Sequence, residues 1–164
     1  MPLTDHGDCV LVAIDVQPGF VSCEEALARA QWLVSLAGVL EVPVVSTEEE
    51  PERYGASLVP PALLKPAFGV EPAPVLAAGR PCAVLIGFET DVCVYQSAVR
   101  LQEAGLRVLV VEDATGSPGE FHARGLSRLR EAGVGLTHAK ALAYEWVRTV
   151  EGASVLPRPA PFTL

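Results

Sequence analysis

The segment spanning residues 83–99, AVLIGFETDVCVYQSAV, constrains the fold of this chain more than any other. It begins with a continuous apolar run that stops at Gly87, a pattern typical of a strand buried on both faces of a parallel sheet. Apolar residues at helical spacing follow almost at once, with Thr90 or Asp91 suited to cap the helix and Cys93 inside its first turn. A thiol is therefore expected where a buried strand ends and a helix begins.

That position has a functional implication. In open α/β sheets the carboxyl ends of the strands face the ligand crevice, and a helix N-terminus favours a thiolate over a thiol. Cys93 is therefore the first candidate for a catalytic residue.

The remaining sequence alternates between strand and helix patterns. Strands are predicted at residues 9–14, 43–47, 62–65, 83–87, 106–111 and 134–136, and helices at residues 23–40, 72–79, 92–104, 117–131 and 139–150. This alternation predicts an α/β fold, a three-layer α/β/α arrangement with a mostly parallel sheet of five or six strands. The 164 residues suit a single domain with a core at about residues 8–151. The proline-containing tail, residues 152–164, is expected to be either strapped to the core or loose.

Composition limits the kinds of partner. Twenty acidic and twelve basic residues give a formal net charge of −8 at pH 7, which opposes binding to nucleic acid or to an acidic membrane surface. Charges or prolines interrupt every apolar run well short of the roughly 18 residues that a membrane span needs. The N-terminus has no basic segment followed by an apolar signal core. We expect a cytoplasmic protein that acts on a small molecule.

A second candidate residue follows the first predicted strand. The apolar, β-branched run at residues 9–14 ends abruptly at Asp15, and the turn sequence at residues 16–20 places this acid at the carboxyl end of the strand. The alternative is an aspartate that only caps the following turn or helix. No GxGxxG motif follows this strand, which argues against a dinucleotide-binding site.

Lys65 is the third candidate, because the chain has ten arginines and only two lysines and this one stands in an apolar segment. A chemical role is one explanation. The other is a lysine at a strand end whose stem reaches solvent.

Metal and disulfide sites are not indicated. An acidic loop at residues 48–54 could suggest a cation site, but such runs are typical of a solvated loop; its glutamates are Glu48, Glu49, Glu50 and Glu52. The other cysteines show no CxxC spacing and are expected to be free thiols in or near the core: Cys9, Cys23 and Cys82. The histidines have no second ligand at metal spacing: His6, His122 and His138. We expect no cofactor.

Three stretches together resemble the isochorismatase-like, or cysteine hydrolase, superfamily. They are residues 14–20 (IDVQPGF), Lys65 shortly before Phe68, and residues 87–94 (GFETDVCV). The Gly-x-Glu-x-x-x-Cys-Val pattern and the pair at residues 47–48 look most like the small isochorismatase-domain subfamily. The resemblance implies a Rossmann-like fold, a homodimer or higher homo-oligomer, and a non-proline cis peptide between residues 88 and 89.

The resemblance also implies roles. Cys93 would attack an amide or related carbonyl, Asp15 would act as the base, and Lys65 would favour the thiolate and orient the pair. Such help is chemically needed, because a free thiol is only a few per cent thiolate at neutral pH. The backbone N–H groups of Glu89 and Cys93 would form an oxyanion hole, and the pocket would be lined by Gln17, Phe20, Phe68 and Phe88.

Positions where this sequence differs from other members of the family limit the reactions that it is expected to catalyse. Nicotinamidases of the family bind a metal through an Asp-x-His motif and further histidines after the second strand, where this chain has TEEEP. Isochorismate hydrolysis in the family does not rely on the cysteine, so Cys93 favours a thiol-dependent amidase. The leading hypothesis is a hydrolase of a C–N bond in a small amide or carbamoyl compound, acting through a covalent acyl-enzyme. The alternative is a non-catalytic or redox-sensing binding or scaffolding subunit.

Overall fold

The computed structural model describes residues 2–164, in which strands and helices alternate. The strands are β1 (Cys9–Ile14), β2 (Val44–Glu48), β3 (Leu63–Leu64), β4 (Cys82–Phe88), β5 (Arg107–Gly116) and β6 (Gly135–Thr137). The α-helices are α1 (Glu24–Val39), α2 (Pro51–Tyr54), α3 (Pro72–Leu76), α4 (Tyr95–Glu103), α5 (Phe121–Glu131) and α6 (Ala139–Val147). Shorter turns are the 3₁₀ helices η1 (His6–Asp8) and η3 (Gly152–Val155) and one turn of π-helix, η2 (Thr90–Val94).

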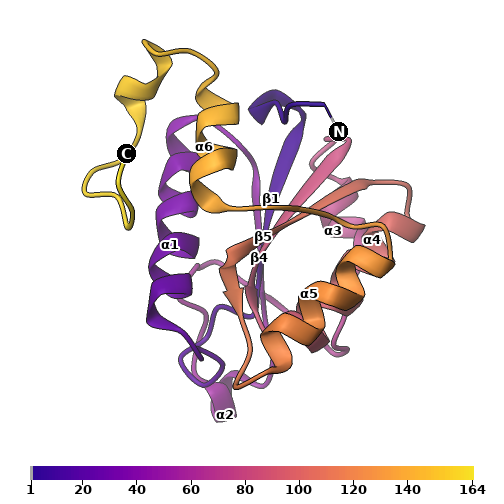
Figure 1. The fold of residues 1–164 in the computed structure, drawn as a ribbon. Helices are drawn as coiled ribbons and strands as arrows, with labels where there is room; N and C mark the ends of the chain where they lie inside the picture. The colour runs from indigo at the N-terminus through magenta and orange to yellow at the C-terminus, as the bar shows by residue number, and fades with distance from the viewer. Residues whose placement is uncertain (1) are drawn as a thin grey trace.

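The six strands form one parallel sheet in the order β3-β2-β1-β4-β5-β6. Helices α1 and α6 cover one face and α3, α4 and α5 cover the other (Figure 1). This arrangement confirms the predicted three-layer α/β/α architecture. Within residues 2–164, no helix has the length and apolarity that crossing a membrane requires.

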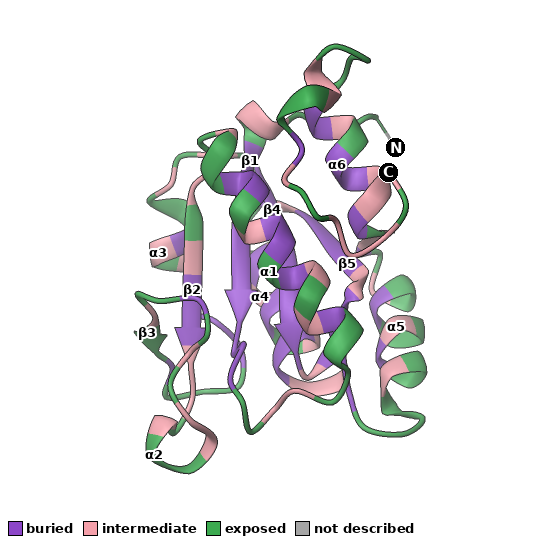
Figure 2. Cartoon of the chain, turned by 90° about the vertical axis from the view of Figure 1, so that its left-hand side faces the viewer, coloured by how far each residue is buried: buried purple, intermediate pink, exposed green. Residues whose placement is uncertain are grey.

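Burial on both faces explains why β1 is apolar at every position. All six of its residues are buried. Alternate side chains enter different cores: Cys9, Leu11 and Ala13 pack on the side of α1 and α6, and Val10, Val12 and Ile14 on the side of α3, α4 and α5. The buried strands form the centre of the molecule in Figure 2. Each large apolar side chain buried in this way contributes about 1.5–3 kcal/mol to folding.

The strand order creates a crevice at the carboxyl ends of β1 and β4. These two strands are neighbours, paired from Cys9–Cys82 to Ile14–Gly87. The chain leaves β1 towards α1 on one face and leaves β4 towards α4 on the other, which makes this the switch point where ligands bind in open α/β sheets. The strand arrowheads in Figure 2 point to this end of the molecule, where α2 also lies.

The predicted helix at residues 92–104 begins differently from expectation. Its first turn is the π-helical η2, in which the N–H of Val94 donates to the carbonyl of Glu89, five residues back, at 3.0 Å. The capping position is therefore Glu89, and not Thr90 or Asp91 as predicted. Helix α4 continues from this turn.

Strand β5 is longer than predicted. It continues past Val111 to Gly116 because its register with β4 shifts between Leu85 and Gly87, after which pairing resumes. A bulge of this kind cannot be inferred from apolar periodicity, which ends at the acidic residues Glu112 and Asp113.

The C-terminal tail is strapped to the core, one of the two expected outcomes. The indole N–H of Trp32 on α1 donates to the carbonyl of Pro157 at 2.9 Å. The ring of Phe162 lies edge-on to Trp32 with a centroid distance of 4.9 Å, and Leu156 is buried. The tail therefore extends the core on the outer side of α1.

Candidate active site

Asp15 lies directly after β1 and is held by the neighbouring strand. Asp15 is 0% exposed, and its carboxylate Oδ1 accepts a hydrogen bond from Thr47 Oγ1 at 2.8 Å. The backbone N–H of Asp15 donates to the same hydroxyl at 3.2 Å. Its φ of 44° is left-handed, a conformation that costs a non-glycine residue roughly 1–2 kcal/mol. The alternative, an aspartate that caps a following turn or helix, does not describe these contacts.

Gly87 allows β4 to approach the end of β1. A Cβ atom at this position would lie 1.9 Å from the carbonyl oxygen of Ile14, and the φ of Gly87 is 116°. Only glycine fits both conditions. The close approach brings the segment after β4 beside Asp15.

Lys65 follows β3, and its ammonium group lies among four acceptors. Nζ is 2.9 Å from Asp15 Oδ2 and 3.0 Å from Glu49 Oε2. It also donates to the carbonyls of Ala67 at 2.9 Å and Phe68 at 2.8 Å. The Lys65 side chain is 2% exposed, so the alternative of a lysine reaching solvent is wrong.

Cys93 lies in η2 and faces the two carboxylates. Its Sγ is 3.7 Å from Glu49 Oε2. One oxygen each of Asp15 and Glu49 and the Sγ of Cys93 all lie within 4.8 Å of one another. The structure therefore brings Asp15, Lys65 and Cys93 together at the carboxyl edge of the sheet, with Glu49 as a fourth member.

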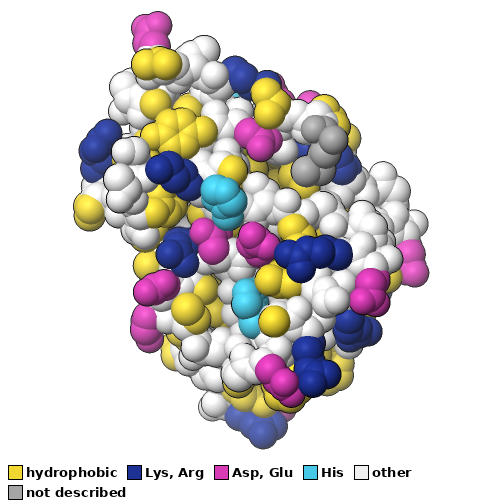
Figure 3. Space-filling view, in the orientation of Figure 1, with side chains coloured by type: hydrophobic (Ala, Val, Ile, Leu, Met, Phe, Trp, Pro, Cys, Tyr) yellow, Lys and Arg dark blue, Asp and Glu magenta, His cyan; other side chains and the backbone are white. Residues whose placement is uncertain are grey.

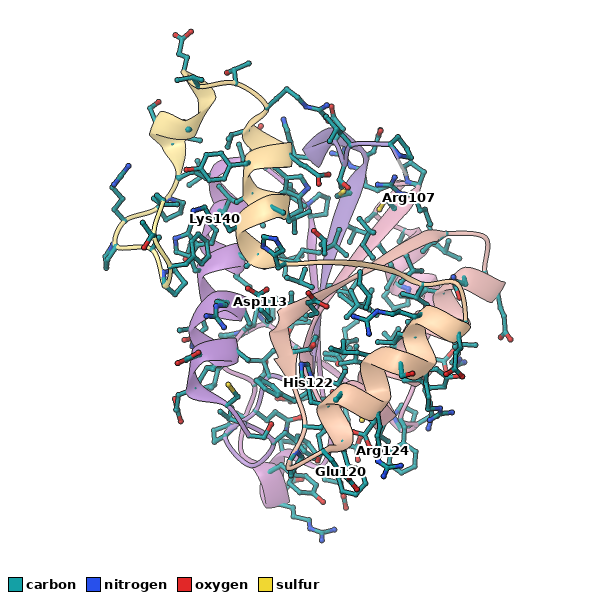
Figure 4. The ribbon with its side chains drawn as sticks, viewed as in Figure 1. Arg107, Asp113, Glu120, His122, Arg124 and Lys140 are labelled. Carbon is teal, nitrogen blue, oxygen red and sulfur yellow. The ribbon has the colours of Figure 1, made fainter. Side chains whose placement is uncertain are left out.

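Helix α5 supports the turn that carries Cys93. A Cβ atom at Gly125 would lie 2.8 Å from the backbone nitrogen of Asp91, so the helix touches the η2 backbone directly. His122 Nδ1 is 2.8 Å from Thr90 Oγ1, and Figure 4 shows His122 on the side of α5 that faces β5. His122 thus has a structural contact behind the site, and burial lowers its pKa.

Glu49 is the site residue that sequence reasoning missed. The acidic loop was expected to be solvated, but the Glu49 side chain is only 15% exposed. Gln17 fixes its backbone: Gln17 Oε1 accepts from the Glu49 N–H at 2.8 Å, and Gln17 Nε2 donates to the Glu49 carbonyl at 2.9 Å. Gln17 also donates to Gly55 at 2.7 Å. The available signal was the position of Glu49 shortly after the end of β2, at the same sheet edge as the other candidates.

Burial and neighbouring charges shift the pKa values of Asp15 and Lys65. Burial raises the pKa of Asp15, although Lys65 and Thr47 oppose that effect. Burial works to lower the pKa of Lys65, but the charge of Asp15 and the hydrogen bonds to Asp15 and Glu49 outweigh it and leave the pKa raised. Lys65 therefore stays protonated and positively charged between two carboxylates.

The Cys93 thiol is not acidified at rest. Burial raises its pKa to about 12; Asp15 and Glu49 add to this shift and Lys65 opposes it. Lys65 thus favours the thiolate, as expected, but burial and the two carboxylates oppose it. The two nearby negative charges and the desolvation of the buried sulfur raise the pKa of Cys93 more than the one cation lowers it.

A small cavity of about 140 Å³ opens onto Cys93. It is lined by Phe20, Glu49, Tyr54, Phe68, Glu89, Val92 and Cys93. The rings of Phe20 and Tyr54 stack with centroids 4.1 Å apart. Gln17 and Phe88, also expected here, do not line it: Gln17 is buried against the loop backbone, and Phe88 packs in the core on the opposite face of the sheet.

The segment between β4 and η2 has the backbone form that the resemblance implied. The peptide bond between Phe88 and Glu89 is cis. Burial and the charge of Asp91 raise the pKa of the Glu89 carboxyl. The oxyanion-hole role of the Glu89 and Cys93 N–H groups stays a prediction.

The same cluster contains the kinds of atom that bind metals, since Asp15, Glu49 and Cys93 each offer one ligand atom within the 4.8 Å group. The ammonium of Lys65 contacts both of these carboxylates and supplies the positive charge between them. Elsewhere, His138 Nδ1 accepts from the backbone N–H of Ala141 at 3.3 Å at the start of α6, a helix-capping role.

This chain is similar in sequence to known proteins. The family model described as Isochorismatase domain matches residues 75–141, which contain β4, η2 and Cys93. Isochorismatase domain-containing protein 2 of Bos taurus is 31% identical over 157 residues, covering 86% of this chain and 76% of the relative.

Two solved structures share the fold at low sequence identity. The YcaC gene product of Escherichia coli, described as an octameric hydrolase of unknown specificity, superimposes with a TM-score of 0.82 at 23% identity, covering 95% of this chain and 89% of YcaC. The MAR1 ribonuclease of Caenorhabditis elegans gives a TM-score of 0.83 at 23% identity, covering 99% of this chain and 98% of that protein. At this identity the likeness concerns the fold alone.

Proposed function

The chain belongs to the isochorismatase domain family, and on that premise we propose that it hydrolyses the C–N bond of small amides or carbamoyl compounds through Cys93. The observation that carries the proposal is the contact set of Lys65, 2.9 Å from Asp15 and 3.0 Å from Glu49, with the Cys93 sulfur beside both carboxylates. A base, a cation and a nucleophile thus share one crevice.

The proposed reaction begins with proton transfer. Because Cys93 rests as a thiol, Asp15 takes its proton as the sulfur attacks the carbonyl carbon, and the raised pKa of Asp15 makes it a better base. The carbonyl oxygen gains negative charge and accepts hydrogen bonds from the N–H groups of Glu89 and Cys93. Asp15 then returns the proton to the leaving nitrogen, which departs as the C–N bond breaks and leaves an acyl group on sulfur.

Hydrolysis completes the cycle. Asp15 removes a proton from water as the oxygen attacks the acyl carbon, and it returns that proton to sulfur as the C–S bond breaks, which gives the free thiol and a carboxylic acid, or a carbamic acid from a carbamoyl group. Lys65 holds the Asp15 carboxylate in place throughout and offsets the negative charge that develops on sulfur. The cavity of about 140 Å³ suits a small substrate.

The test is a screen of small primary amides and carbamoyl compounds with detection of released ammonia. With a compound that is turned over, Cys93→Ala should abolish activity without unfolding, and Asp15→Asn should leave a slow or single-turnover enzyme. Lys65→Arg should fail although it keeps the charge, because the planar guanidinium cannot occupy the position of the compact ammonium. Intact-mass measurement after rapid quench should find an acyl adduct on Cys93.

The competing function is a binding or redox subunit built on the same fold. It predicts no turnover of any amide and no acyl adduct. Full activity in Cys93→Ala would also contradict the proposed mechanism.

We also propose that the protein forms a homo-oligomer. The E. coli relative in fold is described as octameric. In this chain the edge strand β3 exposes Leu63 (49%) and Leu64 (67%), and Phe68 (53%) follows in the next turn. An apolar edge strand of this kind favours pairing with a second copy.

A further inference from the structure

Glu49 is built into the site more firmly than a solvated loop residue would be. Gln17 hydrogen-bonds both the N–H and the carbonyl of Glu49, and Gln17 itself is 0% exposed. The carboxylate of Glu49 contacts Lys65 at 3.0 Å and Cys93 at 3.7 Å, and both contacts use Oε2. Oε1 is the oxygen left to accept a hydrogen bond from a bound molecule.

The charged groups around the cavity are acidic. Among the described residues that line the cavity at Cys93, the charged side chains are Glu49 and Glu89, and no lysine or arginine is present. An adjoining cavity of about 510 Å³ adds Glu50, Glu52 and Lys65. Lys65 is already bonded to two carboxylates and two carbonyls, so it has no donor to spare for an anionic substrate.

The walls of the cavity are aromatic. Phe20 and Tyr54 form a stacked pair on one part of the lining, and Phe68 forms another part. The faces of aromatic rings attract cations, most strongly where water is excluded. A carboxylate next to aromatic rings is a combination that recognises an ammonium group.

We propose that Glu49 makes the site selective for amides that carry an ammonium group, and that it rejects amides that carry a carboxylate. This inference rests on the proposed amidase function for its substrate, but the charge selectivity itself is a property of the Cys93 cavity. An ammonium group on the substrate donates to Glu49 Oε1 and lies against the aromatic wall while the amide carbonyl reaches Cys93. A substrate carboxylate meets Glu49 and Glu89, and no lysine or arginine is among the described residues that line the Cys93 cavity; the nearby Arg53 guanidinium is over the Tyr54 ring, 5.0 Å from its centroid.

Charge selectivity is measurable without turnover by alkylating Cys93. The reagents are 2-bromoethylammonium (cationic), iodoacetamide (neutral) and iodoacetate (anionic), and the Cys93 peptide is followed by mass spectrometry. Each rate is divided by the rate of the same reagent with N-acetylcysteine. The ratios between reagents are independent of the thiolate fraction of Cys93, because all three reagents sample the same thiolate.

After this correction, wild-type protein should react with iodoacetate about tenfold more slowly than with iodoacetamide. It should react with 2-bromoethylammonium several-fold faster than with iodoacetamide. The reason is that one nearby charge in a partly desolvated site changes the free energy of a charged reagent by about 1–2 kcal/mol. Glu49→Gln keeps the shape and an oxygen that accepts from Lys65. It should bring both ratios towards one: the iodoacetate rate relative to iodoacetamide should rise about fivefold, and the 2-bromoethylammonium rate relative to iodoacetamide should fall several-fold. Glu103→Gln removes the same charge from an exposed position at the end of α4 that lines neither cavity, and it should leave both ratios unchanged.

A second arm uses hydrolysis of three matched amides: β-alaninamide (cationic), butyramide (neutral) and succinamate (anionic). The order of kcat/KM should follow the order of the alkylation ratios, and Glu49→Gln should compress it. If no amide is hydrolysed, the proposed function fails while the alkylation ratios still decide the charge selectivity. If Glu49→Gln leaves the ratios within about twofold of wild type, the selectivity assigned to Glu49 is wrong.

Discussion

At the scale of single residues, the state of Cys93 follows from a competition between burial and charge. Cys93 is only 5% exposed. Its sulfur lies near the carboxylates of Asp15 and Glu49, and the ammonium group of Lys65 contacts these carboxylates. Burial and the carboxylates together raise its pKa to about 12. In the proposed mechanism Asp15 therefore acts as a base at the moment of reaction, and no standing thiolate is required.

This state predicts an unusual pH dependence of alkylation. A raised pKa lowers the thiolate fraction at neutral pH and lets it grow about tenfold per pH unit until the pKa is reached. In a Cys23→Ser background, which removes the exposed thiol, the rate of Cys93 modification by iodoacetamide should rise steadily from pH 7 to pH 10. N-acetylcysteine is the reference, and its rate should level off near an ordinary thiol pKa. A plateau for Cys93 below pH 9 would contradict the prediction.

Sequence identified three of the four charged or nucleophilic residues of the cluster because each has a local mark. Asp15 ends a buried strand, Cys93 lies where a strand gives way to a helix, and Lys65 is a rare lysine in an apolar segment. Glu49 has no such mark, since it stands among other glutamates. Its inward position depends on hydrogen bonds from Gln17, which is 32 residues away in the chain, and no local pattern reveals that contact.

At the scale of elements, the site depends on how closely β4 approaches β1. A side chain at Gly87 has no room, because its Cβ would lie 1.9 Å from the Ile14 carbonyl oxygen. That oxygen belongs to the backbone and cannot move aside without displacing Asp15. The paired strands thus determine the distance between Asp15 and the turn that carries Cys93.

Gly87→Ala should therefore cost far more stability than an alanine at another glycine of positive φ. Gly133 is the matched control, with a φ of +75° and no atom within 4 Å of its added Cβ. Gly133→Ala should lower the free energy of unfolding by about 1–2 kcal/mol, the cost of the left-handed backbone. Gly87→Ala should lower it by more than about 4 kcal/mol or abolish the cooperative transition in urea. Equal losses in the two variants would show that the close approach is not rigid.

The order and type of the main elements were predictable, but two features of the elements were not. Apolar runs and helical periods located all six strands and the larger helices. The π-helical turn η2 depends on a bond from Val94 to Glu89, and the extension of β5 depends on a register shift against β4. Both are set by tertiary pairing, and the apolar pattern of a single segment carries no signal for them.

At the scale of the whole molecule, charge disfavours a polyanionic partner. The formal net charge is −8. On the face shown in Figure 3, basic side chains alternate with acidic ones and do not gather into one patch. Figure 4 shows the same mixture, with Asp113 close to α1 and Arg124 and Glu120 together near the start of α5. Pairs such as Arg29–Asp113 and Arg124–Glu120 neutralise one another locally, so this face carries no continuous basic surface of the kind that nucleic acids bind.

We expect the proposed homo-oligomer to form through the exposed edge strand β3. The chain has a mass of 17.3 kDa, and light scattering at micromolar concentration should give an integer multiple of that value, two or more. Leu64→Lys places a charge on the exposed edge strand β3, where Leu64 is 67% exposed, and should shift the mass towards the monomer because a charge cannot be buried unpaired between two copies. Val150→Lys makes the same change at a residue that is 98% exposed and follows α6, far along the chain from β3. This variant should leave the mass unaltered.

A wild-type mass of 17.3 kDa contradicts the oligomer itself. A multimeric mass that Leu64→Lys does not reduce places the interface on a surface other than the β3 edge.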